Sequence, residues 1–307
     1  MSLLVVGSMA YDSIETPFDK IDQALGGSAT FFSAAASFFV PVNLVAVVGN
    51  DFDMREIEFL KAKKVDLTGL TVEDGKTFRW KGRYHANMID RETIYTELNV
   101  FENFNPLLPE SYKKSEYVFL ANIQPDLQYS VVQQILQPKF IAMDTMNFWI
   151  AGTPDSLRRT LAAVNALLIN DSEVKQLSGE ANIFSGAEKI QQMGPKTIII
   201  KKGEHGAILV HNDQRFFCPA FPVNFLVDPT GAGDTFAGGF MGYLAKTQEI
   251  NAENLKRAVI YASALASFSV ESFSTARLQT LKAEEILNRV QVIRDMIHVR
   301  EGDWIRL

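Results

Sequence analysis

Short apolar runs recur along the chain and fit buried β-strands. They are rich in β-branched residues, and most are separated by segments with helical spacing, which is typical of an α/β fold. The runs are continuous rather than alternating, so both faces of each strand are expected to be covered, as in a doubly wound parallel sheet. A binding site is then expected at the carboxyl ends of the strands. The expected strands are 3–6, 42–48, 117–120, 140–143, 166–169 and 197–201.

The order of elements changes after about residue 205. Two short strands are expected around Asn212 and Asp213, and segments with helical spacing follow near 232–246, 252–270 and 281–296. The C-terminal third is therefore predicted to be rich in helix. A further small helix with several aromatic residues is expected over 31–39.

The segment 77–85 has a different pattern. Phe78, Trp80 and Tyr84 alternate with polar residues at a period of two, which indicates a strand with one covered face. Residues 94–100 alternate in the same way, and 88–92 would connect the two strands. The pattern predicts a hairpin outside the main sheet.

Composition narrows the class of protein. The chain has 307 residues, of which 47% are hydrophobic and 21% charged, as in ordinary globular proteins. The net charge of −6 gives no reason to expect a nucleic-acid partner. Cys218 is the only cysteine, so no intrachain disulfide can form, and this favours a reducing compartment with the cytoplasm as the default. No apolar stretch indicates export or membrane insertion.

The most informative motif is the run Asp228-Pro-Thr-Gly-Ala-Gly-Asp-Thr-Phe236, which precedes a small, apolar helical segment. Gly231–Asp234 would lie on the first turn of that helix, where free N–H groups and the helix dipole favour an anion such as phosphate. A carboxylate beside a phosphate is better suited to take a proton than to bind the anion. We therefore expect phosphoryl transfer to a hydroxyl group, with Asp234 as the base. The alternative is an ordinary Asp in a first helical turn beside tight-turn glycines.

This run resembles the C-terminal signature of the ribokinase-like (PfkB) family of carbohydrate and nucleoside kinases. The resemblance implies that Asp234 is the catalytic base and that the backbone of Gly231, Ala232 and Gly233 forms the anion hole. Further similar segments occur in the family's order along nearly the whole chain. The implied fold is a three-layer α/β/α domain with a mostly parallel central sheet and a small β-sheet lid. We expect a single domain over 1–307, whose discontinuous lid comes from about 10–25 and 76–102.

The resemblance also implies a sugar-binding region. Asp12 would accept hydrogen bonds from two substrate hydroxyls, as suits a side chain that only accepts, and Gly26 and Gly27 would let the backbone approach the ring. Phe31 stands where many relatives have an Asn that contacts the sugar, so the usual pentose contacts are open to change. In the lid, Asn99 and Arg83 are further candidates for substrate binding. Arg83 shares a strand face with Arg79 and Lys81, and these three would either bind a sugar phosphate or act as solvated charges that protect an edge strand.

The nucleotide site is implied by three segments. Asn170 and Glu173 resemble the family's Asn-x-x-Glu motif, in which the Glu holds water around Mg²⁺ and the Asn lies near the phosphates; the alternative is a helix N-cap. The segment from Lys201 through Gly203 to Gly206 resembles the nucleotide loop, and its alternative is a turn with solvated lysines. Adenine would lie against the region of Ser263 and Val270, which also fits plain core. Asp228 and Thr230 stand where relatives hold a monovalent cation, so the cofactors implied are ATP and Mg²⁺, with K⁺ as a further option.

The sequence therefore predicts an ATP-dependent kinase that phosphorylates a hydroxyl group of a small sugar. A nucleoside kinase of the same fold is the first alternative, because the aromatic residues Phe31, Trp80 and Tyr84 near the lid would stack on a base if they are not lid core. A non-catalytic sugar-sensing relative is the second. The resemblance also allows a homodimer through the lid.

Overall fold

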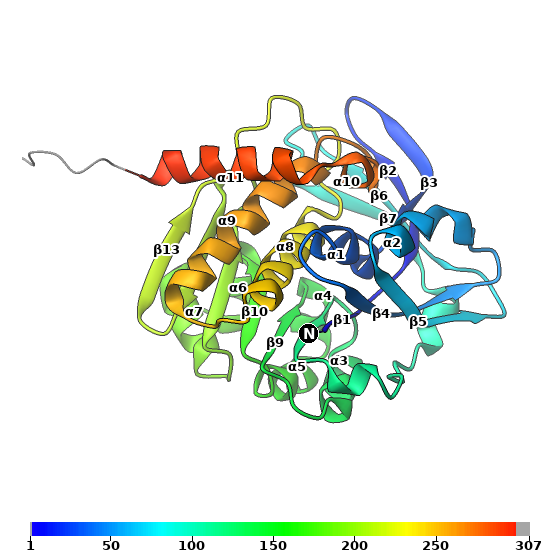
Figure 1. Cartoon of the computed structure of the whole chain (residues 1–307), viewed down its shortest axis with the longest axis horizontal. Helices are drawn as coiled ribbons and strands as arrows, with labels where there is room; N and C mark the ends of the chain where they lie inside the picture. Colours follow the sequence, from blue (N-terminus) through cyan, green and yellow to red (C-terminus); the bar gives the residue numbers. More distant parts are fainter. Residues whose placement is uncertain (1, 299–307) are drawn as a thin grey trace, which may run out of the picture.

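The computed structural model describes residues 2–298 of the chain (Figure 1). The larger of its two sheets has nine strands in the order β13-β12-β11-β10-β9-β8-β1-β4-β5. Neighbouring strands from β10 to β5 pair in parallel, as does β10 with β11, whereas β11, β12 and β13 pair antiparallel. The strands are β1 (Leu3–Val6), β4 (Val42–Gly49), β5 (Val65–Glu73), β8 (Tyr117–Leu120), β9 (Phe140–Asp144), β10 (Ala166–Asn170), β11 (Thr197–Lys201), β12 (Ala207–His211) and β13 (Gln214–Cys218).

All six strands expected from apolar runs are present, and so are the two around Asn212 and Asp213. The edge strand β5 has no counterpart among the expected strands. Only Val65 and Gly69 are buried in it, so it lacks a continuous apolar run. Gly69 permits close pairing, because a Cβ atom there would lie 2.6 Å from the Leu44 carbonyl oxygen. Because β5 buries so few residues, its sequence does not have the continuous apolar run from which the other strands of this sheet are predicted.

Helices cover both faces of the large sheet. Alternate residues of β1 show the division, since Leu3 and Val5 belong to one buried cluster and Leu4 and Val6 to the other. The first cluster lies under α1 (Ser28–Ala36), α2 (Glu58–Ala62), α8 (Ala232–Thr247), α9 (Ala252–Ser269), α10 (Ala276–Thr280) and α11 (Ala283–Ile297). The second lies under α3 (Pro125–Gln134), α4 (Asn147–Gly152), α5 (Pro154–Leu161), α6 (Asp171–Ser178) and α7 (Ile183–Gln191). The predicted three-layer α/β/α class is confirmed.

Short 3₁₀ turns complete the described elements. They are η1 (Met54–Ile57), η2 (Asn99–Asn103), η3 (Tyr112–Lys114) and η4 (Gly203–His205). No helix within residues 2–298 has the length and apolarity needed to cross a membrane. The single-domain organisation over 1–307 stays a prediction, and Met1 and 299–307 lie outside the described residues.

A separate sheet of four strands lies beside the large one, in the order β3-β2-β6-β7 (Figure 1). Its strands are β2 (Ala10–Glu15), β3 (Lys20–Gly26), β6 (Phe78–Tyr84) and β7 (Arg91–Glu97). The expected hairpin is present, but its second strand lies earlier in the chain than 94–100. The strand ends because Asn99 adopts a left-handed φ of 51° and begins the turn η2. Residues 85–90, rather than 88–92, connect β6 to β7.

Two helix starts matter for the site. The predicted helix over 31–39 begins earlier, at Ser28, and Gly27 precedes it with a φ of 93°. A side chain at Gly27 would place its Cβ 2.5 Å from the Ser8 carbonyl oxygen, so glycine lets the chain turn tightly after β3. The helix predicted over 232–246 is α8, which packs closely on α1, since a Cβ at Gly238 would lie 2.3 Å from the Phe32 carbonyl oxygen.

Candidate active site

The start of α8 forms the centre of the site. Gly231 precedes the helix with a left-handed φ of 76°, and the Thr235 amide donates to the Gly231 carbonyl over 2.8 Å. Gly231, Ala232, Gly233 and Asp234 all keep partial solvent exposure. The first amides of a helix have no intrahelical acceptor, so this exposed turn can present N–H groups to an anion.

Phe31 from α1 fixes the shape of this turn. Its ring lies so close to Gly231 that a Cβ atom on Gly231 would be 2.5 Å from three ring carbons. The Phe31 side chain is buried, with 1% of its surface exposed. The glycine is therefore required by a packing contact as well as by its left-handed φ. Substrate contact by Phe31 stays a prediction.

Lys201 at the end of β11 reaches the same turn. Its Nζ would be 3.3 Å from a Cβ atom at Gly233, and it donates to Asp144 Oδ2 over 2.7 Å. The Asp144 side chain is 6% exposed and that of Lys201 21%, so this is a largely buried ion pair. Sequence reasoning proposed Lys201 and missed Asp144. The available signal was its position directly after the apolar run 140–143, at the carboxyl end of a strand.

The surroundings of Asp234 suit a general base. Burial raises the pKa of the Asp234 carboxyl to about 7, and repulsion from Asp144 adds to this effect. Lys201 and Arg91 act in the opposite direction because they favour the charged carboxylate. Asp234 can therefore change its protonation state near neutral pH, as an acid–base catalyst requires.

Asp12 on β2 is a second carboxylate of the same region. Burial, followed by repulsion from Asp228, raises the pKa of Asp12 to about 7, while the Gly27 amide favours its charged form. Asp12 lies against Gly26, where a Cβ atom would be 1.9 Å from Asp12 Oδ2. The absence of a side chain at Gly26 thus makes room for this carboxylate. Contact between the Gly26 backbone and a sugar ring stays a prediction.

Asp228 lies behind the helix start and is fully buried. Its Oδ1 accepts from the Thr230 amide over 2.9 Å, whereas its Oδ2 is buried without a hydrogen-bond partner among the described residues. Burial raises the pKa of Asp228 to about 6, and the hydrogen bonds from Thr230 oppose this shift. A buried carboxylate oxygen without a partner suits an oxygen-binding cation.

The small sheet contacts this loop directly. The Tyr84 and Thr230 hydroxyl groups share a hydrogen bond of 3.1 Å, although 146 residues separate them in sequence. Arg91 lies opposite Tyr84 in the β6–β7 register, so both side chains leave the same face of the small sheet. Its guanidinium also lies 5.5 Å from the centre of the Trp80 ring.

Arg91 adds positive charge to the site from the lid side. It favours the charged forms of Asp12 and Asp234 and so lowers the pKa of each. The sequence pattern does not indicate this residue, because it predicts that 88–92 connects the two strands of the hairpin. Only the observed start of β7 shows that Arg91 faces the site.

Asn170 and Glu173 form the start of α6. Asn170 Oδ1 accepts from the Glu173 amide over 2.8 Å, and Glu173 Oε2 accepts from the Asn170 amide over 3.0 Å. The N-cap alternative is thus observed, and a role at phosphates or Mg²⁺ stays a prediction. Burial raises the pKa of Glu173, and the nearby Lys201 opposes this shift. No three His, Cys, Asp or Glu side chains form a metal cluster within residues 2–298.

The other expected nucleotide residues lie in the turn between β11 and β12, within α9 and directly after α9. Gly203 has open space around it, whereas Gly206 must be small because a Cβ atom would lie 2.0 Å from the Cys218 carbonyl oxygen. Ser263 is buried and contacts the Cys218 thiol. Val270 accepts through its carbonyl from the Val227 amide over 2.8 Å. Their contacts with a nucleotide remain predictions.

The charged lid residues are engaged with carboxylates. Arg83 donates to Glu15 over 2.8 Å, and Lys81 lies 3.1 Å from the same carboxylate. Arg79 pairs with Asp51 over 2.7 Å. Asn99 donates to the Thr77 carbonyl oxygen over 3.0 Å and so holds the base of the hairpin. The structure gives Arg83 and Asn99 local partners, and their predicted substrate contacts are untested.

Comparison with known proteins relates the chain to kinases. Residues 2–281 match the profile described as pfkB family carbohydrate kinase. The cytidine kinase of Thermococcus kodakarensis is 27% identical over 252 residues, covering 79% of this chain and 88% of that protein. The nucleoside kinase of Methanothermobacter thermautotrophicus is 25% identical and covers 89% of this chain and 90% of that protein. An Escherichia coli protein designated ribokinase II, solved with ATP and Mg²⁺, superposes with a TM-score of 0.77 at 22% identity, covering 95% of this chain and 99% of that one.

The buried pair of Lys201 and Asp144 leads to a stability prediction. We expect Lys201→Met to lower the free energy of unfolding by about 3 kcal/mol, because it leaves the Asp144 carboxylate without its cation. Adding Asp144→Asn should restore part of the loss. Lys189→Met is the matched control, since Lys189 forms an exposed pair with Glu180 and should lose about 1 kcal/mol or less. Urea denaturation measures all three variants, and equal losses for Lys201→Met and Lys189→Met would contradict the prediction.

Proposed function

The chain belongs to the pfkB family of carbohydrate kinases, and we propose that it transfers the γ-phosphoryl group of ATP to a hydroxyl group of a small sugar, with Asp234 as the base. The observation that carries this proposal is the arrangement at the start of α8. There the pKa of Asp234 is raised to about 7, and Lys201 lies beside Gly233 in the same turn. A proton acceptor, helix amides and a cation thus surround one partly exposed position.

The chemistry follows from these positions. The acceptor oxygen attacks the γ-phosphorus, the bond from phosphorus to the ADP oxygen breaks, and the hydroxyl proton passes to Asp234. The amides of Gly231, Ala232 and Gly233 stabilise negative charge on the phosphoryl oxygens. Lys201 adds a fixed positive charge that is held in place by Asp144. Asp12 accepts hydrogen bonds from the acceptor and aligns its hydroxyl group.

Mg²⁺ fits the acidic groups near Lys201. Asp144 and Glu173 would supply hard oxygen atoms to an ion that keeps several waters and nucleotide oxygens. When bound, Mg²⁺ neutralises charge on the phosphates. The ribokinase II structure of Escherichia coli, which superposes on this chain, was solved with ATP and Mg²⁺.

The loop before α8 contains groups that would bind a monovalent cation such as K⁺. Asp228 is fully buried, its Oδ2 has no hydrogen-bond partner within residues 2–298, and the Thr230 amide donates to its Oδ1. These are the residues that would hold the ion. Its binding would favour the charged form of Asp228, against the raised pKa of this carboxyl.

A nucleoside acceptor is the second candidate. Trp80 lies opposite Asp12 in the β2–β6 register, on the same face of the small sheet, and its indole extends over Gly82, where a Cβ atom would be 2.1 Å from the ring. An aromatic surface beside a hydroxyl-binding carboxylate suits a base attached to a sugar. Relatives that are a cytidine kinase and a nucleoside kinase favour the same candidate. The sugar-sensing alternative is disfavoured because Asp234 and its surrounding charges have no use without turnover.

Two further proposals concern the protein as a whole. A homodimer through the lid is supported by β7, which forms the edge of the small sheet and whose side chains are all exposed. A cytoplasmic location is supported by the single cysteine of the chain.

An ADP-release screen tests the proposed function. Free sugars, sugar phosphates, polyols and nucleosides are each added with ATP and Mg²⁺, and turnover is compared with ATP hydrolysis without an acceptor. We expect a sugar or a nucleoside to raise turnover clearly above that background. A response to nucleosides alone would select the second candidate, and no response across the panel would remove both.

Replacement of the base gives a sharper test. Asp234→Asn should lower kcat by at least about 100-fold, because the side chain can no longer take the proton, while ATP binding stays near wild type. Asp155→Asn is the matched control, since Asp155 is an exposed carboxylate in the first turn of α5. Steady-state kinetics and calorimetric ATP titration provide the two readouts. Wild-type kcat in Asp234→Asn would exclude the assigned role.

The pKa of Asp234 also predicts the pH dependence. The base must be deprotonated, so kcat/KM should fall as the pH drops below about 7. Asp144 raises this pKa, whereas Lys201 and Arg91 lower it. Arg91→Met should therefore move the acidic limb to higher pH. Arg83→Met, which removes a lid arginine bound to Glu15, should leave the acidic limb in place. If the acidic limb of Arg91→Met also stays at its wild-type pH, Arg91 does not act on the base.

A further inference from the structure

The segment 270–276 between α9 and α10 holds the loop that carries Asp228. The Val270 carbonyl oxygen accepts from the Val227 amide over 2.8 Å and from the Asp228 amide over 3.3 Å. The Ser274 amide lies near the Asp228 carboxylate and favours its charged form. Ser274 adopts a left-handed φ of 57°, and its hydroxyl donates to the carbonyl oxygen of Leu25, which directly precedes Gly26 and Gly27. This segment therefore connects three parts of the proposed site.

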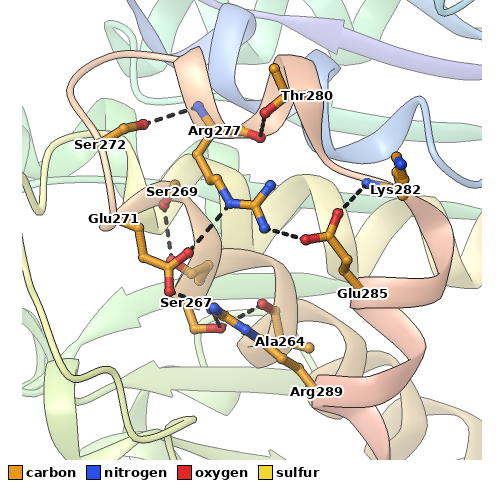
Figure 2. Close-up of polar contacts among 11 residues, drawn as sticks. Ala264, Ser267, Ser269, Glu271, Ser272, Arg277, Thr280, Lys282, Glu285 and Arg289 are labelled. Atoms are coloured by element: carbon orange, nitrogen blue, oxygen red, sulfur yellow. Dashed lines mark hydrogen bonds and ion pairs between the residues drawn. The ribbon is translucent and has the colours of Figure 1, made fainter.

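The segment is itself held by charged side chains, as Figure 2 shows. Glu271 accepts a hydrogen bond from Arg289 of α11 and forms an ion pair of 3.5 Å with Arg277 of α10. Arg277 also binds Glu285 at the start of α11 and donates from its backbone amide to the Ser272 hydroxyl over 3.0 Å. Two arginines thus hold Glu271 and Ser272, near the beginning of this short irregular segment.

Arg289 is the most enclosed member of this network. Its side chain is 13% exposed, and burial lowers its pKa while Glu271 opposes the shift. It donates to the Ser267 hydroxyl over 2.7 Å. Its guanidinium lies 3.5 Å from the centre of the Phe268 ring and 4.3 Å from that of Phe221. Arg289 therefore contacts the end of α9 and, through Phe221, the chain that leads from β13 to Asp228.

We infer that Arg289 is a positioning residue for the proposed reaction. Through Glu271 it holds 270–276 in the shape in which Val270 and Ser274 fix Asp228, so α11 sets the geometry of the loop before the anion hole. Among the described contacts no group of the network touches the start of α8, so its effect on turnover must pass through the contacts of the 270–276 segment with Asp228 and Leu25. The expected effect on kcat rests on the proposed function, whereas the expected effect on the geometry of the Asp228 loop rests on the contacts alone.

The test combines hydrogen–deuterium exchange with kinetics on the full-length protein. Arg289→Met should speed amide exchange in peptides covering 225–230 and 268–276, and it should lower kcat by about 10-fold or more, because small displacements near reacting groups slow catalysis strongly. Arg289→Lys should recover part of both effects, since it keeps the charge. Arg294→Met is the matched control, because Arg294 lies on the same helix, is exposed, and has its described contact with Gln291.

Two outcomes would overturn the inference. In the first, folded Arg289→Met exchanges faster in 268–276, but its exchange at 227–228 and its kcat equal those of wild type. In the second, Arg289→Met has the same exchange rates and kcat as Arg294→Met. If Arg289→Met does not fold, Glu271→Gln tests the same link, since it keeps the side-chain shape and removes the charge that both arginines bind. The exchange comparison uses the protein without substrate, so it stands even if wild type shows no turnover and the proposed function fails.

Discussion

The central constraint of this structure is the gathering of acidic groups around the start of one helix. Asp12, Asp144, Asp228 and Asp234 come from four separate segments, and burial raises the pKa of Asp12, Asp228 and Asp234, with repulsion between carboxylates adding to the shift of Asp12 and Asp234. Such a cluster is unfavourable unless cations balance it. Lys201 is the fixed cation, and it is bound to Asp144. Burial, with repulsion from Asp144 as a second cause, keeps the pKa of Asp234 near 7, so this carboxyl can exchange a proton near neutral pH. The metal ions of the proposed function would balance the negative charge that remains.

Glycines allow this crowding by making room for neighbouring side chains. A Cβ atom at Gly26 would overlap the Asp12 carboxylate, and one at Gly231 would overlap the Phe31 ring. Motif glycines at nucleotide and sugar sites are usually explained by close approach of the backbone to a ligand. Here the immediate demand comes from the protein itself. A substitution at either position would therefore disturb the placement of a site residue before any ligand is considered.

The sequence was sufficient for the elements whose local pattern matches their burial. The central strands are apolar on both faces, and the helix after Gly231 follows a recognisable motif, so both could be predicted. β5 was missed because it lies at an edge and buries little, and β7 was displaced because the left-handed conformation of Asn99 is set by tertiary contacts. Asp144 and Arg91 could not be assigned, since their roles depend on strand order and register. The motif predicted the centre of the site, and only the fold shows which charges surround it.

The loop from Asp228 to Gly231 is where these separate constraints meet. The Asp228 carboxylate is fully buried, and its Oδ2 has no hydrogen-bond partner among the described residues, so local interactions alone would not hold the loop in this shape. Tyr84 holds it from the lid, and Val270 holds it from the end of α9. Because the contact from the small sheet is made at Thr230, any movement of that sheet would act on the same loop that precedes α8. Under the proposed function, closure of the sheet over an acceptor would therefore also shape the phosphate site, and this coupling would favour phosphoryl transfer only when the acceptor is enclosed.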